Sequence, residues 1–200
     1  MNASVTTSGG PGGPKRADAR RNYERLLGAA AAAFAEHGAD DVSLEEIARR
    51  AGVGIGTLYR HFPARQALLE AVYKDQVDGL DVLAGKLLVG ESPGDALGEW
   101  MRAFVAFGRT KRSLSSALVE TIGKNSELLS SCSKILRGRT DELLKRAQEA
   151  GEARPEVQCT DIFRLAHGLI MATDAEPSDP DQADRLLRLV TDSVLSGPRR

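Results

Sequence analysis

The sequence predicts an all-α protein, and three observations support this fold class. Apolar residues recur at helical spacing through most of the 200-residue chain. The eight prolines lie in the first residues, at helix edges or near the C-terminus, and none stands inside a convincing helical pattern. Two short helical patterns on either side of Gly52 are typical of a helix-turn-helix. We therefore expect an N-terminal three-helix domain followed by a larger C-terminal helical domain.

The chain is predicted to have three segments. Residues 1–14 are uncharged and rich in Gly, Pro, Ser and Thr, which predicts a disordered leader. Residues 15–64 form the expected helix-turn-helix domain, and residues 65–200 form the second helical domain. No apolar run approaches the roughly 18 residues of a membrane helix, and a signal-peptide pattern is missing. These features predict a cytoplasmic protein.

The chemistry-bearing residues argue against metal binding and catalysis. Cys132 and Cys159 are far apart and belong to no CxxC or Cys/His group, so we expect neither a metal site nor a disulfide framework. We find no GxSxG, phosphate loop, HExxH or nucleophile-base pair. We therefore expect no catalytic residues, no metal and no cofactor, and an activity that consists of binding. A helical enzyme remains the alternative, which a turnover assay would detect.

The helix-turn-helix can be followed residue by residue. A first helix from about Asp18 to His37 turns Leu26, Leu27, Ala30, Ala33 and Phe34 inward. Ser43 and Glu46 form a capping box that begins the next helix, and Gly52 supplies the left-handed residue that ends it. A short helix from Ile55 ends near Phe62, because Pro63 disfavours helical geometry in the residue before it.

Five helical patterns follow. A long helix from Arg65 to about Leu88 connects the two domains, and Ser92–Pro93 begins a helix with Leu97, Trp100 and Phe104 on one face. A pattern from Leu114 to Ile122 leads into a long amphipathic segment from Leu128 to Ala147. The next helix contains Ile162–Met171, and the last helix begins at Asp179–Gln182.

The short helix after Gly54 has side chains that suit duplex DNA. Thr57 and Arg60 can hydrogen-bond base edges, whereas Tyr59, His61 and the Ser43 hydroxyl suit phosphate oxygens. In the alternative interpretation, the aromatic residues only fill the core of a helical hairpin.

Basic residues precede the first helix and offer a second contact with DNA. The segment from Lys15 to Arg65 has nine basic and seven acidic residues, while the whole chain has a net charge of −1. Lys15, Arg16 and Arg20 could reach phosphates or a minor groove from a flexible arm. A solvated helix start explains the same residues equally well.

Residues 20–69 resemble the DNA-binding domain of the TetR family of transcriptional regulators. The resemblance rests on Ala51–Gly52–Val53, Gly56–Thr57–Leu58–Tyr59, His61–Phe62 and similar short motifs. It implies that Ser43, Thr57, Tyr59 and His61 contact operator DNA. Arg65 stands where the family usually has lysine, and Gly54 stands where it commonly has a capping serine. The complete predicted DNA-binding set is Lys15, Arg16, Arg20, Ser43, Gly54, Ile55, Gly56, Thr57, Tyr59, Arg60, His61 and Arg65.

The last two helices are apolar on more than one face, which favours a homodimer. They could form a four-helix bundle with a second copy, and the resemblance implies the same arrangement. The residues predicted at this interface are Phe163, Ala166, Leu169, Leu186, Val190 and Val194. A hairpin buried within one chain is the alternative. A two-fold dimer would place two recognition helices about 34–36 Å apart, as a palindromic operator requires.

Aromatic residues of the second domain could line a small-molecule site. The predicted set is Trp100, Phe104, Phe107, Ile122, Phe163, His167 and Met171. The same residues could simply be core. Together these features predict a homodimeric, sequence-specific DNA-binding repressor that an apolar or amphipathic small molecule releases from its operator. A helical scaffold that has lost DNA binding is the alternative, suggested by Gly54 and the weakly basic N-terminal domain.

Overall fold

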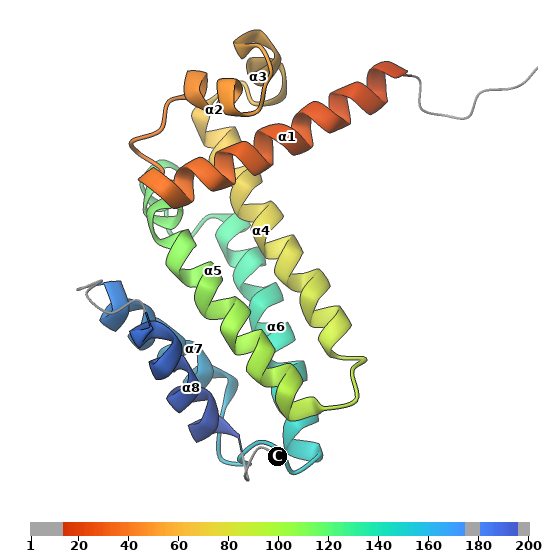
Figure 1. The fold of residues 1–200 in the computed structure, drawn as a ribbon, viewed down its shortest axis with the longest axis vertical. Coiled ribbons are helices and arrows are strands. Elements are labelled where there is room, and N and C mark those ends of the chain that lie inside the picture. Colours follow the sequence, from red (N-terminus) through yellow and green to blue (C-terminus); the bar gives the residue numbers. More distant parts are fainter. Residues whose placement is uncertain (1–13, 175–180, 196–200) are drawn as a thin grey trace, which may run out of the picture. The chain divides into compact units, whose positions relative to one another are not determined.

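The computed structural model describes residues 14–174 and 181–195 of the chain. The described residues confirm the predicted all-α fold, with no strand among them beyond an isolated bridge between Ala153 and Leu195 (Figure 1). Apart from Pro14, the predicted leader lies outside the described residues, as does the predicted start of the last helix at Asp179. The helices are α1 (Pro14–His37), α2 (Leu44–Arg50), α3 (Ile55–His61), α4 (Arg65–Leu87), α5 (Pro93–Ile122), α6 (Glu127–Glu149), α7 (Cys159–Asp174) and α8 (Gln182–Val194).

The chain divides into two compact units within α4, between Leu68 and Leu69. In the first unit α1 packs against α2 and α3. Their contact is a small apolar core, whose buried side chains include Leu26, Ala30, Phe34, Ile47 and Leu58. The two short helices are therefore held by tertiary packing, because a seven-residue helix is not stable by itself.

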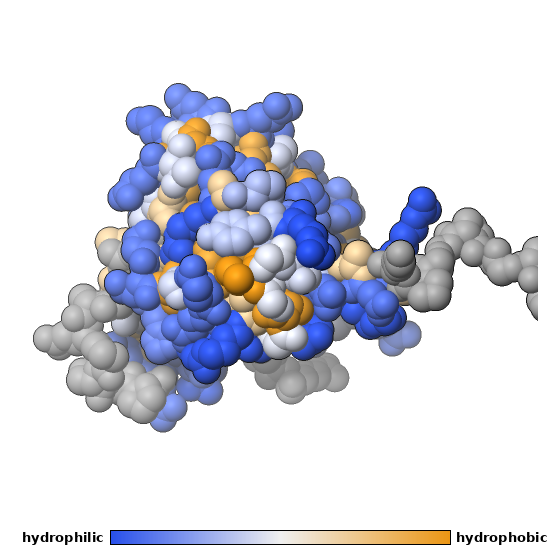
Figure 2. All heavy atoms as spheres, turned by 90° about the horizontal axis from the view of Figure 1, so that it is seen from above, coloured by the Kyte–Doolittle hydropathy of each residue, from blue (hydrophilic) through white to orange (hydrophobic). Residues whose placement is uncertain are grey.

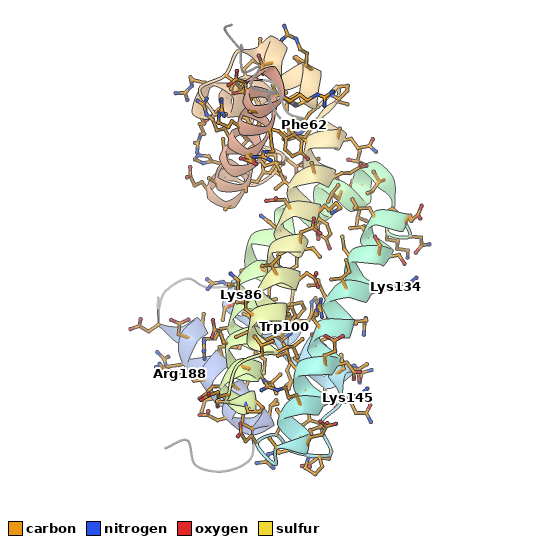
Figure 3. The ribbon with its side chains drawn as sticks, turned by 90° about the vertical axis from the view of Figure 1, so that its right-hand side faces the viewer. Phe62, Lys86, Trp100, Lys134, Lys145 and Arg188 are labelled. Atoms are coloured by element: carbon orange, nitrogen blue, oxygen red, sulfur yellow. The ribbon has the colours of Figure 1, made fainter. Side chains whose placement is uncertain are left out.

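In the second unit α5 lies against α6, α7 and α8, and α7 lies beside α8 (Figure 1). The indole of Trp100 is fully buried in the interior of this unit (Figure 3). Its Nε1 donates a hydrogen bond of 2.9 Å to Oγ1 of Thr140 on α6. This bond provides the partner that a buried indole N–H requires.

Local sequence signals predicted most helix boundaries, but not the end of α5. The Ser92 hydroxyl accepts a hydrogen bond from the Asp95 N–H, which confirms the predicted cap of α5. The expected continuation from Leu114–Ile122 into the next segment is wrong, because residues 114–122 are the end of α5. Gly123 ends that helix with φ of 79°, and Ser126 caps α6. No described helix has the length and apolar character needed to cross a membrane.

Candidate nucleic-acid interface and ligand cavity

The α2–α3 segment has the geometry of a helix-turn-helix. The Ser43 Oγ accepts a hydrogen bond of 3.1 Å from the Glu46 N–H, which confirms Ser43 as the N-cap of α2. The Glu46 carboxylate of the predicted capping box accepts a hydrogen bond from Arg50. Gly52 has φ of 62°, a conformation that side chains other than glycine rarely adopt. Gly54 then caps α3 through its backbone alone, and its carbonyl accepts the N–H of Thr57 at 2.8 Å.

Helix α3 presents most of its predicted DNA-binding side chains to solvent. Leu58 is buried against the rest of the unit, whereas Tyr59 is 45% exposed and Arg60 is also exposed. Thr57 is half-buried, and Ile55 and Gly56 are exposed. Figure 2, which looks onto the end of Figure 1 that shows α2 and α3, shows mostly hydrophilic residues around a small hydrophobic area. A polar, exposed helix of this kind can enter a major groove.

The ring of Tyr23 contacts two aromatic rings at the end of α3. Tyr23 of α1 lies 5.2 Å from the ring of Phe62 and 5.8 Å from that of His61, measured between ring centroids. His61 is half-buried and Phe62 is buried. The half-buried His61 ring thus packs in part against Tyr23 of α1.

Arg25 supports the turn, a role that helical periodicity does not reveal. Its Nη2 donates a hydrogen bond of 3.1 Å to the carbonyl oxygen of Gly52, 27 residues away. A Cβ atom on residue 52 would overlap the same guanidinium group. The main chain of the turn between α2 and α3 is therefore attached to α1 through the Arg25 side chain.

A second cluster attaches α2 to α1. Arg50 donates hydrogen bonds to Glu36 at 2.6 Å and to Glu46 at 2.9 Å, and its Nη2 lies 3.0 Å from Nε2 of His37. The hydrogen bond and charge of Arg50 hold the pKa of Glu36 below its usual value. The cluster is exposed to solvent, so its main effect is to orient α2 rather than to stabilise it strongly.

Arg65, expected at the DNA, contacts the loop between α1 and α2. Its Nη1 donates a hydrogen bond of 2.7 Å to the Val42 carbonyl, and its Nη2 donates to the Ala39 carbonyl. The guanidinium also lies 5.9 Å from the centroid of the Phe34 ring. The side chain is partly buried in these contacts, so we infer that it positions the helix-turn-helix.

We expect Arg65→Ala to destabilise the first unit by about 1–3 kcal/mol, because two carbonyl groups would lose their hydrogen-bond partner. Arg65→Lys should recover only part of this loss, because an ammonium group lacks the forked geometry. Denaturant unfolding measures the change. The control is Arg49→Ala, whose side chain is 77% exposed. If both alanine variants unfold alike, the positioning role is wrong.

The predicted basic arm is only partly described. Arg16 and Arg20 are exposed on α1, and Arg20 lies 3.5 Å from Glu24 in a surface ion pair. The side chain of Lys15 lies outside the described residues. Contact of these residues with DNA stays a prediction.

The second unit contains a cavity of about 410 Å³ between α5, α6 and α7. Its walls are mainly apolar, and three serines and a histidine add polar groups. The lining residues are Phe104, Phe107, Gly108, Ser115, Ser116, Ser133, Leu136, Phe163, His167, Ile170 and Met171. A cavity of this size and composition is typical of small-molecule sites.

Five of the seven predicted ligand-binding residues line this cavity, whereas Trp100 and Ile122 do not. Trp100 lies behind the wall, with its ring stacked on Phe104 at a centroid distance of 6.2 Å. Phe104 in turn meets Phe163 edge to face at 4.8 Å. The predicted set lacked the three serines and Gly108, because small residues give no periodic signal, and it also lacked Leu136 and Ile170.

The predicted dimer residues fall into two groups. Ala166, Leu169 and Val194 are buried within the chain itself, and Leu169 packs against Val105 and Leu187. Leu186 and Val190 are half-buried on α8, and Phe163 lines the cavity. The large apolar side chains that are exposed on the described parts of these helices are Leu165, Met171 and Leu189, with 39%, 46% and 65% of their surface accessible.

Family models match both units. A model for bacterial regulatory proteins of the tetR family matches residues 26–72. A model for the C-terminal domain of SbtR-like transcriptional regulators matches residues 92–194, about half of the chain.

Solved structures and curated sequences agree with these matches. The TetR transcriptional regulator SCO0520 from Streptomyces coelicolor is 35% identical with a TM-score of 0.76, covering 88% of this chain and 99% of its own. A TetR transcription regulatory protein from Mycobacterium vanbaalenii is 36% identical with a TM-score of 0.74, covering 92% and 100%. The HTH-type transcriptional regulator SAUSA300_2515 of Staphylococcus aureus is 38% identical over 63 residues, 32% of this chain. That match spans only about a third (34%) of the Staphylococcus protein.

Proposed function

Because the chain belongs to the TetR family of bacterial transcriptional regulators, we propose that it is a homodimeric repressor released from its operator by a small molecule. The observation that carries the proposal is the pairing of two features in one chain. Helix α3 presents Tyr59 and Arg60 to solvent, and the second unit contains a cavity of about 410 Å³. A regulator of this kind acts on chromosomal DNA, so we expect it in the cytoplasm.

Operator binding is supported by the contrast between one buried and two exposed side chains on α3. Leu58 anchors the helix while its neighbours Tyr59 and Arg60 point away from the core. A tyrosine hydroxyl suits phosphate oxygens, and an arginine suits the base edges of a G·C pair. Arg25 donates a hydrogen bond to a carbonyl of the turn before α3, and Arg65 donates one to a carbonyl of the loop before α2. These contacts support the helix-turn-helix from outside α3.

The support for a dimer is the exposed apolar face of α7 and α8. Leu165, Met171 and Leu189 have large exposed surfaces, and Gly168 and Ala172 of the same helix α7 are exposed as well. Small residues beside apolar ones allow two helices to approach closely. A two-fold contact through this face would bury apolar area that is otherwise unfavourable in water.

The proposal is tested by an electrophoretic shift on DNA from the region upstream of the gene that encodes the chain. The repressor should protect a palindromic site whose half-sites lie about one helical turn, 34–36 Å, apart. Genomic footprinting of the bound sites would identify the regulated genes, and a transcription assay at such a site would separate repression from activation. Failure to bind any such site would overturn the proposal and favour a scaffold.

We expect ligand binding and operator binding to oppose each other. A ligand that prefers a different spacing of the recognition helices should lower operator affinity about 5–150-fold, equivalent to about 1–3 kcal/mol, and DNA should weaken ligand binding equally. Trp100 fluorescence should change over the same concentration range, because its ring stacks on Phe104 at the cavity wall. Phe104→Ala should shift both curves together. A ligand that changes the fluorescence without affecting DNA binding would contradict this mechanism.

A further inference from the structure

Three hollows of the second unit share walls along α6 and α7. The apolar cavity and a second hollow of about 370 Å³ are both lined by Phe163 and His167. Ser133 lines the cavity and a third hollow of about 440 Å³, and Arg137 lines the second and the third. The apolar cavity therefore adjoins two outer hollows.

The outer hollows are basic. Their walls include Lys124, Lys134, Arg137 and Arg164, and no carboxylate lines any of the three hollows within the described residues. None of these four side chains forms an ion pair with another described residue. Residues 66–200 have a net charge of −3, so this gathering of positive charge is a local feature.

Arg137 joins the apolar and the basic environment. Its guanidinium carbon lies 4.7 Å from the centroid of the Phe163 ring, and that ring lines the cavity. Ser133, which borders the cavity and the third hollow, lies about one helical turn before Arg137 on α6. A positive group thus stands at the edge of an apolar chamber.

From this arrangement we propose that the effector is an anionic amphiphile. Its apolar chain would fill the cavity, and Arg137 and Lys134 would bind its carboxylate or phosphate group. Arginine binds both acids through paired charge-assisted hydrogen bonds. A neutral or cationic effector would leave this cluster of positive charges without a partner. The inference rests on the proposed function, because it gives the chemical class of the effector for the same site.

The experiment compares four ten-carbon probes on the full chain by calorimetry, below their micelle concentrations: decanoate, monodecyl phosphate, decanol and decylamine. An apolar cavity alone favours the alcohol, because it does not have to desolvate a charge. We expect both anions to bind at least tenfold more tightly than decanol, and the advantage to shrink with added salt. The ratio between the two anions tells which acid the site prefers.

Two variants locate the headgroup. Arg137→Gln should weaken decanoate binding about tenfold or more and leave decanol binding unchanged, because it removes only charge-assisted hydrogen bonds. Lys134→Gln should act in the same direction. The matched control is Lys145→Gln, which is also on α6, is 65% exposed, pairs with Asp141 and lines none of these hollows (Figure 3).

Decanol binding as tight as decanoate, no binding of any probe, or an unaffected Arg137→Gln variant would overturn the inference. An electrophoretic shift without amphiphile tests the proposed function separately. If decanoate binds through Arg137 but the operator stays bound, release by an effector fails while the ligand class stands.

Discussion

Tyr59→Ala will weaken binding to every DNA sequence, whereas Arg60→Ala will mainly relax sequence specificity. Both side chains project from α3 into solvent, so neither change should disturb the core around Leu58. A tyrosine that binds phosphates contributes equally to all sequences. An arginine that binds base edges contributes roughly 1–3 kcal/mol to discrimination against a wrong base pair.

Titration of operator and unrelated DNA at physiological salt measures both effects. Circular dichroism and light scattering should show that each variant is folded and has the wild-type mass. Arg102→Ala, which removes an exposed arginine from α5, is the control for lost charge. A folded Tyr59→Ala variant with full operator affinity would show that Tyr59 has another role.

If the proposed dimer forms through α7 and α8, Leu189→Glu will divide it, and Leu169→Glu will unfold the chain. Leu189 is 65% exposed on α8, so a single chain tolerates a charge there. In a two-fold interface the two glutamates would meet or be buried, and such contacts cost several kcal/mol. Leu169 is 5% exposed among Val105, Ala166 and Leu187, and a carboxylate buried there would have no partner.

Analytical ultracentrifugation gives the mass of each variant, and thermal unfolding gives its stability. Val82→Glu is the control, because Val82 of α4 is 59% exposed and lies on neither α7 nor α8. A folded Leu189→Glu protein that keeps the mass of a dimer would place the interface elsewhere. A Leu169→Glu variant of wild-type stability would contradict the observed packing.

The sequence predicted helix starts well because their signals are local. A serine followed by a residue that completes the cap sets the start of α2, and the same chemistry sets the start of α5. The end of α5 was less evident, since apolar spacing continues on both sides of Gly123. That residue ends the helix by adopting φ of 79°, which no periodic pattern reveals.

The cavity was harder to predict than the core. Trp100 and Phe104 lie four residues apart on one face of α5, so helical spacing predicts the same inward position for both. The structure places Trp100 against Thr140 and Phe104 at the cavity wall. Periodicity indicates which side chains point inward, but whether an inward side chain meets a void depends on the shapes of neighbouring helices.

The sequence was equally unable to predict which long side chains bind distant main-chain groups. Arg65 begins α4, and its partners Ala39 and Val42 lie more than twenty residues earlier. Arg65 was expected at the DNA because the resemblance to the TetR family places it where that family usually has lysine. Only the tertiary fold brings the two carbonyl groups within reach.

The contacts of Arg25 and Arg65 also determine which residues of the helix-turn-helix can be substituted. Both arginines hold carbonyl oxygens, of Gly52 and of Ala39 and Val42, and every residue has such an oxygen whatever its side chain. Substituting the exposed side chains of α3 therefore leaves in place the carbonyl oxygens that Arg25 and Arg65 bind. Libraries that vary Tyr59 and Arg60, with the half-buried Thr57, while keeping Arg25, Gly52 and Arg65 would test whether α3 can be directed to new operators on an unchanged scaffold.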